Sequence, residues 1–154
     1  EFDAIHASPP CQRYSHCTPK RYRENHPDVI DSLRELLLKI GKPYVIENVS
    51  GARHKLVNPV KLCGSMFGLK SFRHRFFEIW PFFILAPDCV HNFRPLLVTS
   101  AGSNSRAIRQ RPHKSVKNSV VCYGIDWMTC DELKQTFPVR YTEFIGVQLM
   151  ELFR

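Results

Sequence analysis

Cys11 is the first residue in this sequence whose type and setting suggest chemistry. It follows two prolines in Ser8-Pro9-Pro10-Cys11-Gln12, and a loop stiffened in this way can hold a sulfur atom toward a pocket. The thiolate is the reactive form of cysteine, so Cys11 is a candidate nucleophile. Taken alone, the same residue also fits an ordinary loop thiol.

Glu47 and the pair Arg73-x-Arg75 are the next candidates. Glu47 lies within the apolar run 43–49, where a carboxyl group is unfavourable unless it is paired or protonated. A protonated Glu47 would act as a proton donor, whereas a solvent-facing Glu47 would pair with a lysine. On a strand, Arg73 and Arg75 would point to one face and could grip carbonyl oxygens or phosphates. The alternative is a solvated basic edge.

The predicted elements bring Cys11 and Glu47 to one place. An alternating segment at 2–7 predicts a strand that ends at Ser8-Pro9-Pro10, and apolar residues at helical spacing predict a helix over 28–40 that stops at Gly41. The run 43–49 predicts a second strand. Strand, helix and strand in this order indicate a parallel βαβ unit, whose strands end at the same sheet edge.

Later segments predict one more strand and two helices. Residues 75–80 read as a strand ended by Pro81, whereas 82–123 shows no sustained period and predicts a loop-dominated insert. Thr129 and Glu132 form a capping-box pattern that predicts a helix to about Phe137. A last amphipathic helix is expected from about Tyr141 to Phe153.

Three motifs in order resemble the DNA cytosine carbon-5 methyltransferases. Ser8-Pro9-Pro10-Cys11-Gln12 is similar to their Pro-Cys-Gln nucleophile loop, and Ile46-Glu47-Asn48-Val49 to their Glu-Asn-Val motif. Arg73-His74-Arg75-Phe76-Phe77 resembles the Gln-x-Arg-x-Arg motif, with Ser71 in place of the usual Gln. The segment 124–146 resembles the closing region of the compact bacteriophage enzymes. Three motifs in the family's order are far more specific than any one alone.

The resemblance implies roles for four side chains. Cys11 would add to carbon 6 of a flipped cytosine in duplex DNA, which makes carbon 5 nucleophilic toward the methyl group of S-adenosylmethionine. Glu47 would hold ring nitrogen 3 and the exocyclic amine and supply a proton as charge develops. Arg75 would hold the carbonyl oxygen of the base, and Arg73 a phosphate or the active-site loop.

The resemblance also implies contacts, a fold and a domain plan. Pro10 and Gly146 would contact the cofactor, and Gln12 and Ser15 would contact DNA. The expected fold class is α/β, a partial Rossmann-like S-adenosylmethionine-dependent methyltransferase sheet with a small irregular target-recognition insert. Residues 1–81 would form the catalytic core, 82–123 the basic insert, and 124–154 helices returning to the core.

Two departures from the family pattern concern the cofactor. The Phe-x-Gly-x-Gly loop that cradles the methionine end of the donor is absent, and Gly146 is followed by Val147 where the family has Asn. We therefore expect a fragment of a longer enzyme, or one half of a split enzyme, in which a preceding segment or a second subunit completes the cofactor pocket.

Charge favours a polyanionic partner. The chain has 22 Lys+Arg against 14 Asp+Glu, a formal net charge of +8. No acidic residue lies between Asp88 and Asp126, and the basic residues of this stretch predicted to contact DNA are Arg106, Arg109, Arg111, Lys114 and Lys117. Two alternative functions remain open, a non-catalytic DNA-binding module and a transfer-RNA cytosine methyltransferase.

Cysteine spacing and hydropathy further narrow the class of protein to which the chain could belong. The six cysteines form no Cys-x-x-Cys pair, and Cys89-x-His91 has no second pair at ligand spacing, so no metal is expected. The sequence has neither a bilayer-length apolar run nor a basic signal-peptide start, which predicts a cytosolic protein that does not bind membranes. The resemblance to the compact bacteriophage enzymes implies a bacterial host or a phage-infected cell as the setting.

Overall fold

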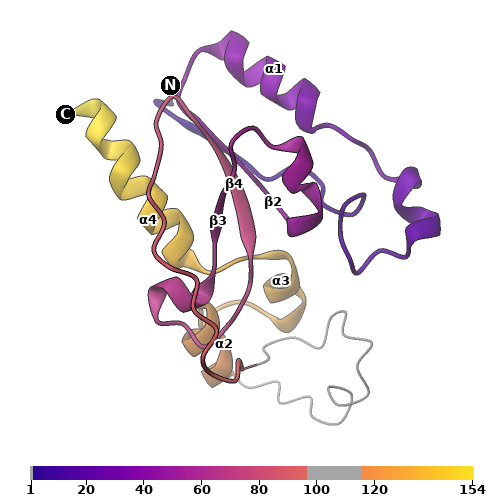
Figure 1. The fold of residues 1–154 in the computed structure, drawn as a ribbon, viewed down its shortest axis with the longest axis vertical. Coiled ribbons are helices and arrows are strands. Elements are labelled where there is room, and N and C mark those ends of the chain that lie inside the picture. Colours follow the sequence, from indigo (N-terminus) through magenta and orange to yellow (C-terminus); the bar gives the residue numbers. More distant parts are fainter. Residues whose placement is uncertain (1, 97–115) are drawn as a thin grey trace. The chain divides into compact units, whose positions relative to one another are not determined.

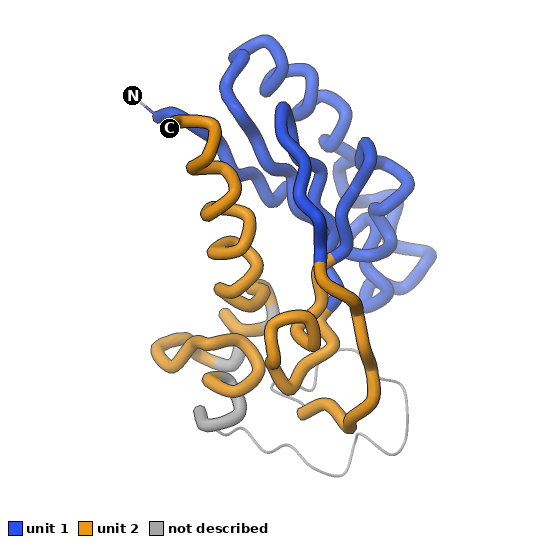
Figure 2. The backbone as a smooth tube through the Cα atoms, turned by 60° about the vertical axis from the view of Figure 1, so that its left-hand side comes forward, with its two compact units in different colours: residues 1–61, 74–86 blue, residues 62–73, 87–154 orange. Residues whose placement is uncertain are grey.

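The chain forms a mixed α/β fold around a four-stranded mixed sheet in the computed structural model, which describes residues 2–96 and 116–154 (Figure 1). The chain divides into two compact units, and Figure 2 colours them separately. Unit 1 comprises residues 1–61 and 74–86, and unit 2 comprises residues 62–73 and 87–154. The functional segments expected from the sequence (1–81, 82–123 and 124–154) follow other boundaries and stay a prediction.

The sheet has the strand order β1-β2-β4-β3. Its strands are β1 (Ile5–Ala7), β2 (Tyr44–Asn48), β3 (Val60–Leu62) and β4 (Arg75–Trp80). The expected parallel pairing of β1 and β2 is confirmed, with Ala7 opposite Ile46. β4 runs antiparallel to β2, and Glu47 is opposite Phe77. The amino end of β4 therefore lies beside the carboxyl end of β2.

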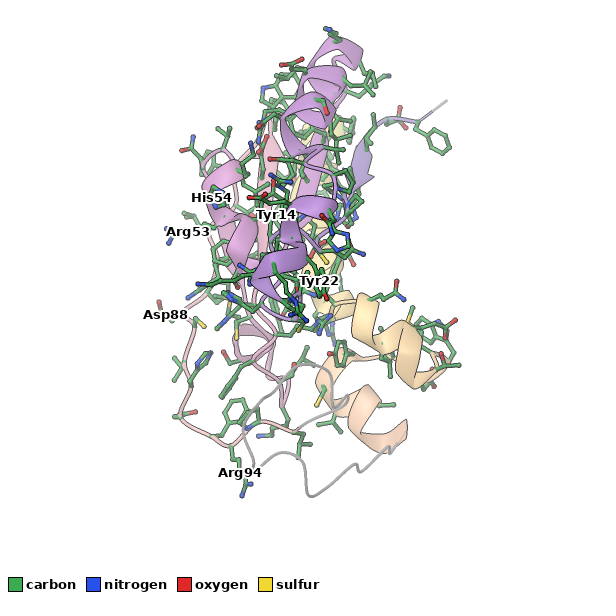
Figure 3. All side chains as sticks on the ribbon, turned by 90° about the vertical axis from the view of Figure 1, so that its right-hand side faces the viewer. Tyr14, Tyr22, Arg53, His54, Asp88 and Arg94 are labelled. Atoms are coloured by element: carbon green, nitrogen blue, oxygen red, sulfur yellow. The ribbon has the colours of Figure 1, made fainter. Side chains whose placement is uncertain are left out.

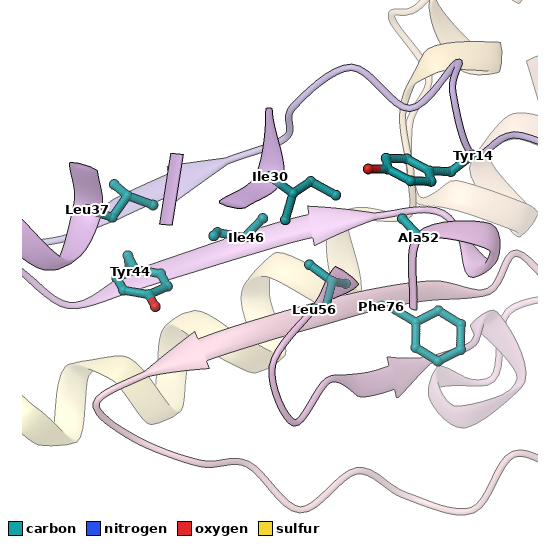
Figure 4. Close-up of a cluster of buried hydrophobic side chains, with 8 residues drawn as sticks. All are labelled: Tyr14, Ile30, Leu37, Tyr44, Ile46, Ala52, Leu56 and Phe76. Atoms are coloured by element: carbon teal, nitrogen blue, oxygen red, sulfur yellow. The ribbon is translucent and has the colours of Figure 1, made fainter. Parts of the chain in front are cut away.

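Helix α1 (Ile30–Ile40) connects the parallel strands and packs its apolar face on one side of the sheet. It ends at Gly41, whose φ of 70° is a left-handed conformation that favours glycine. The core of unit 1 gathers buried side chains from α1, β2, β4 and the loops between them. These are Tyr14, Ile30, Leu37, Tyr44, Ile46, Ala52, Leu56 and Phe76 (Figure 4).

Unit 2 contains the remaining α-helices, α2 (Val116–Tyr123), α3 (Cys130–Gln135) and α4 (Val139–Leu149). Its small core consists of Cys122, Tyr123, Ile125 and Leu133, with Met128 and Val139 against it. The predicted capping box at the start of α3 is confirmed, because Thr129 and Glu132 bond reciprocally. Short 3-10 turns complete the chain at η1 (Lys20–Asn25), η2 (Ser50–Lys55), η3 (Gly64–Phe67) and η4 (Met150–Phe153).

The structure corrects several sequence-based boundaries. The first strand begins at Ile5 rather than near Phe2, and the last α-helix spans Val139–Leu149 before turning into η4. Residues 82–96 contain neither helix nor strand, as expected, but α2 lies within the segment predicted to be loop. Strand β3 was not predicted, because three residues give too short a pattern for periodicity to detect.

Candidate active site

The loop that carries Cys11 is fastened to the end of β2. The Asn48 side-chain amide donates a hydrogen bond to the Pro9 carbonyl at 3.1 Å, and the Asn48 side-chain oxygen accepts one from the Val49 amide. The carbonyl of Cys11 accepts hydrogen bonds from the amides of Tyr14 and Ser15 at 3.0 and 2.9 Å. Asn48 of the Glu-Asn-Val segment therefore positions the backbone two residues before the half-buried Cys11.

Glu47 and Arg75 form an ion pair on the neighbouring strands β2 and β4. Arg75 Nε lies 2.7 Å from Glu47 Oε1, and both side chains are largely buried. The antiparallel register explains the contact. Arg75 is the first residue of β4 and lies diagonally across from Glu47, which is near the end of β2. A carboxylate next to a guanidinium can bind a flat ligand that presents both donors and acceptors at its edge.

The alternation argument for Arg73 is wrong, because β4 begins at Arg75 and Arg73 lies outside the strand. Arg73 belongs to unit 2, where its carbonyl accepts a hydrogen bond from the Tyr141 hydroxyl at 2.6 Å. Its guanidinium lies over the Tyr123 ring, 5.6 Å from the centroid. The structure thus brings Glu47 and Arg75 together, and the role of Arg73 stays a prediction.

The backbone beyond Cys11 rests directly on the turn after β2. A Cβ atom at Gly51 would lie 2.0 Å from the Tyr14 carbonyl oxygen, so only glycine permits this approach. The Tyr14 hydroxyl donates a hydrogen bond to Asp28, and Arg13 Nη1 donates one to the His26 carbonyl at 3.1 Å. Burial and the Asp28 carboxylate raise the Tyr14 pKa, which keeps this hydroxyl a donor. The loop is therefore anchored on both sides of Cys11.

A basic pocket of about 380 Å³ adjoins this loop within unit 1. Tyr14 and His54, both labelled in Figure 3, meet edge to face there, and their ring centroids are 5.9 Å apart. The side chains that line the pocket carry several basic groups and one acidic group, and they belong to Arg13, Tyr14, His16, Arg23, Glu24, Gly51 and His54. Sequence reasoning missed this pocket, although its basic residues come shortly after the Cys11 and Glu47 motifs in the sequence.

The predicted DNA contacts are only partly described. Gln12 is exposed and Ser15 is half-buried, and the Ser15 hydroxyl accepts a hydrogen bond from the Cys17 amide at 3.1 Å. Lys117 is described only as part of the α2 backbone. Four of the predicted contacts lie outside the described residues, namely Arg106, Arg109, Arg111 and Lys114.

The two expected cofactor contacts do not fit a donor pocket among the described residues. Pro10 is exposed in the loop, and Gly146 lies inside α4, where an added Cβ would meet no atom within 4 Å. Neither residue forms a cradle that a side chain would fill. The roles of Pro10 and Gly146 as cofactor contacts stay predictions.

No known protein family, curated protein sequence or solved structure matches this chain. Among the described residues, no helix is both long and apolar enough to cross a membrane. The inference of function therefore rests on the motifs and on the geometry of unit 1.

Proposed function

We propose that this chain carries the base-binding and nucleophilic half of a DNA cytosine carbon-5 methyltransferase. The observation that carries the proposal is the Glu47–Arg75 pair, at 2.7 Å, one residue from the Asn48 tether of the Cys11 loop. Parallel pairing of β1 and β2 supports the same edge for Cys11 and Glu47. The fold supports an α/β class, and a Rossmann-like methyltransferase sheet is the finer proposal, since doubly wound sheets commonly include an antiparallel strand.

The proposed chemistry begins when a cytosine leaves the duplex and enters the site. The Cys11 thiolate forms a bond to carbon 6, and the electron pair of the carbon 5–carbon 6 double bond moves toward ring nitrogen 3. The Glu47 carboxyl group takes up a proton from solvent as the base enters and gives it to that nitrogen, and its other oxygen accepts a hydrogen bond from the exocyclic amine. Arg75 donates to the carbonyl oxygen, so both groups stabilise charge that develops during addition.

S-adenosylmethionine is the donor that the motif resemblance implies, and it would supply the methyl group for carbon 5. The residues around Cys11 do not form its pocket, so we propose that another segment or subunit binds it. The step assigned to this chain needs no donor. When water protonates carbon 5 of the adduct, loss of the other carbon-5 proton to solvent, return of the nitrogen-3 proton to Glu47 and release of the thiolate restore the base with its hydrogen exchanged.

Hydrogen exchange at carbon 5 therefore tests the proposal directly. The chain is incubated with duplex DNA tritiated at carbon 5 of cytosine, and tritium released to water is counted. We expect release that Cys11→Ser abolishes and that Glu47→Gln slows by about a hundredfold or more. Cys17→Ser is the matched control, because Cys17 is an exposed thiol six residues away in the same loop, and it should retain release.

The outcomes separate the alternatives. If the folded chain binds the duplex but releases no tritium, and Cys11→Ser binds equally well, methyl-transfer chemistry is contradicted. That outcome would favour a non-catalytic DNA-binding module. Release from tritiated transfer RNA and not from duplex DNA would favour a transfer-RNA enzyme. Equal release from wild type and Cys11→Ser would remove Cys11 as the nucleophile.

A further inference from the structure

The basic pocket of unit 1 is lined by three backbone segments, the Cys11 loop, η1 and η2. Its basic side chains come from these segments in turn and are those of Arg13, His16, Arg23 and His54. Gly51 of η2 lies against the Tyr14 carbonyl, where a Cβ atom would come within 2.0 Å of the oxygen. One wall of the pocket is therefore in direct backbone contact with the loop that carries Cys11.

Backbone carbonyls hold both guanidinium groups of the pocket. Arg13 Nη1 donates hydrogen bonds to the carbonyls of His26 and Glu24 at 3.1 and 3.5 Å. Arg23 Nε donates one to the Thr18 carbonyl at 3.1 Å. A guanidinium carries several N–H donors on three nitrogens, so bonds at one nitrogen fix each group and leave the others for a ligand. Groups fixed in advance lose less conformational entropy when they bind.

The charges of the pocket favour an anion. Its two arginines are positively charged and its two histidines offer imidazole N–H donors, whereas Glu24 is the acidic side chain of the lining. The Asp28 carboxylate lies 4.0 Å from Arg13 Nε, which is too far for a hydrogen bond. Asp28 instead accepts a hydrogen bond from the Tyr14 hydroxyl and pairs with Lys55 at 3.3 Å.

We propose that this pocket binds one backbone phosphate of the strand whose cytosine Cys11 attacks. The inference rests on the proposed function, because an extruded base stays joined to its own strand. Phosphates of one strand recur about every 3.4 Å along the duplex axis, so one of them passes close to a loop that reaches the base. Arg13 is two residues from Cys11, and a guanidinium fork matches two oxygens of a phosphate. The volume of about 380 Å³ has room for a phosphodiester and bridging water.

A phosphate held in this pocket positions the strand and does not read its sequence. Phosphate contacts fix the register and orientation of a protein on the duplex, whereas base edges carry the sequence information. Gly51 joins η2 to the Cys11 loop, and Asn48 joins the same loop to the end of β2, next to Glu47. The phosphate, the sulfur and the carboxyl group are thus held by one connected set of backbone contacts.

The salt dependence of duplex binding tests the pocket. The affinity of the full chain for a fluorescently labelled duplex is measured at several salt concentrations for wild type and two variants. We expect Arg23→Ala to lower the slope of log affinity against log salt by about 0.9, the value for one phosphate, with duplexes of any sequence. Arg21→Ala is the matched control and should keep the slope. It removes the same charge from η1, but the Arg21 guanidinium lies over the Tyr22 ring, 4.7 Å from its centroid, and outside the pocket lining.

The folds of the variants are compared with wild type by circular dichroism. If Arg23→Ala unfolds, Arg23→Gln replaces it, because the amide removes the charge and can still donate to the Thr18 carbonyl. Equal slopes for wild type and the Arg23 variant would overturn the proposal. An equal loss of slope in Arg21→Ala would also overturn it, because net charge alone would then explain the effect.

Inorganic phosphate separates a strand contact from a site for a free anion. The imidazole signals of His16 and His54 are assigned by nuclear magnetic resonance with His16→Asn and His54→Asn and are followed as phosphate is added. Saturable shifts of both signals, together with a duplex slope that Arg23→Ala leaves unchanged, would make the pocket a free-anion site and contradict the strand contact. Saturable shifts together with the lowered slope would support it.

The same slopes, measured in Cys11→Ser, keep this inference distinct from the proposed function. A slope difference that persists in Cys11→Ser, with no tritium release from wild type, would support the phosphate contact and remove the chemistry. Tritium release from wild type with equal slopes would support the chemistry and overturn the pocket.

Discussion

Glu47 and Glu78 are buried carboxylates on adjacent strands, and the register places them on opposite faces of the sheet. Ile46 is opposite Glu78, and Ile46 packs with the core under α1, so Glu47 points to the other face. Glu78 accepts hydrogen bonds from Arg34 Nε and Nη2 at 2.7 and 2.8 Å and from the Tyr44 hydroxyl at 3.1 Å. Burial and the Glu78 carboxylate raise the pKa of Tyr44 to about 12. Glu78 is therefore a structural anchor.

Replacing Glu78 should destabilise the fold without touching the chemistry. Glu78→Gln removes the buried charge partner of the largely buried Arg34 guanidinium and leaves only the exposed Asp31, at 2.9 Å, so we expect the free energy of unfolding to fall by about 3 kcal/mol. Denaturant unfolding followed by circular dichroism measures the change. Glu35→Gln is the control, because Glu35 is exposed on α1, the helix that carries Arg34. Unchanged stability in Glu78→Gln would contradict the anchor role, and tritium release from the folded fraction should stay at the wild-type rate.

At the scale of elements, the local sequence pattern predicted the helices and strands that depend on local interactions. The strands ending near Ala7 and Asn48, the helix between them and β4 all follow from periodicity and from breakers such as Gly41. The direction of β4 does not, because antiparallel pairing depends on long-range contacts. That direction is what brings Arg75 to Glu47, and the start of β4 is what leaves Arg73 outside the strand.

The contact between Cys63 and His91 and the basic pocket could not be predicted from local sequence pattern, for a similar reason. Cys63 Sγ lies 3.3 Å from His91 Nε2, although the two residues are 28 positions apart and no periodicity links them. Helix α2 was missed because it is short, and polar residues at its start weaken the apolar stripe. The sequence motifs thus identified candidate residues of the site, and the fold showed which other residues they contact.

The capping box of α3 should respond to acid. The Glu132 carboxylate accepts from the Thr129 amide at 2.7 Å, and this bond lowers the pKa of Glu132. Because the folded pKa is lowered, the stabilisation is complete above the unfolded pKa near 4.5 and is lost as pH falls through the lower folded value. Glu132→Gln can keep the reciprocal hydrogen bond but cannot titrate.

Unfolding curves over the acidic range measure this effect. We expect Glu132→Gln to remove the part of the acid dependence that arises from this carboxyl. Thr129→Ala should lower the free energy of unfolding by about 1 kcal/mol at neutral pH. Glu143→Gln, on the exposed face of α4, is the matched control. Identical acid profiles for wild type and Glu132→Gln would show that the cap does not contribute.

At the scale of the whole molecule, the net charge of +8 favours the proposed polyanionic partner. Positive groups occur in the pocket beside the Cys11 loop and, in sequence, in the acid-free stretch from Asp88 to Asp126. A protein that neutralises several phosphates releases the counterions bound to them. Affinity for duplex DNA should therefore depend steeply on salt, whatever the chemistry at Cys11.

Binding at several salt concentrations tests that charge-based interaction. If about four phosphates are neutralised, duplex affinity should fall roughly a hundredfold between about 50 and 200 mM salt. Replacing both Arg109 and Arg111 by alanine should reduce the slope by about two contacts. Arg140→Ala is the comparison, because its guanidinium on α4 already pairs with Glu143 at 2.7 Å. A slope near zero would exclude phosphate contacts as the source of affinity, and a slope reduced equally by Arg140→Ala would reflect net charge alone.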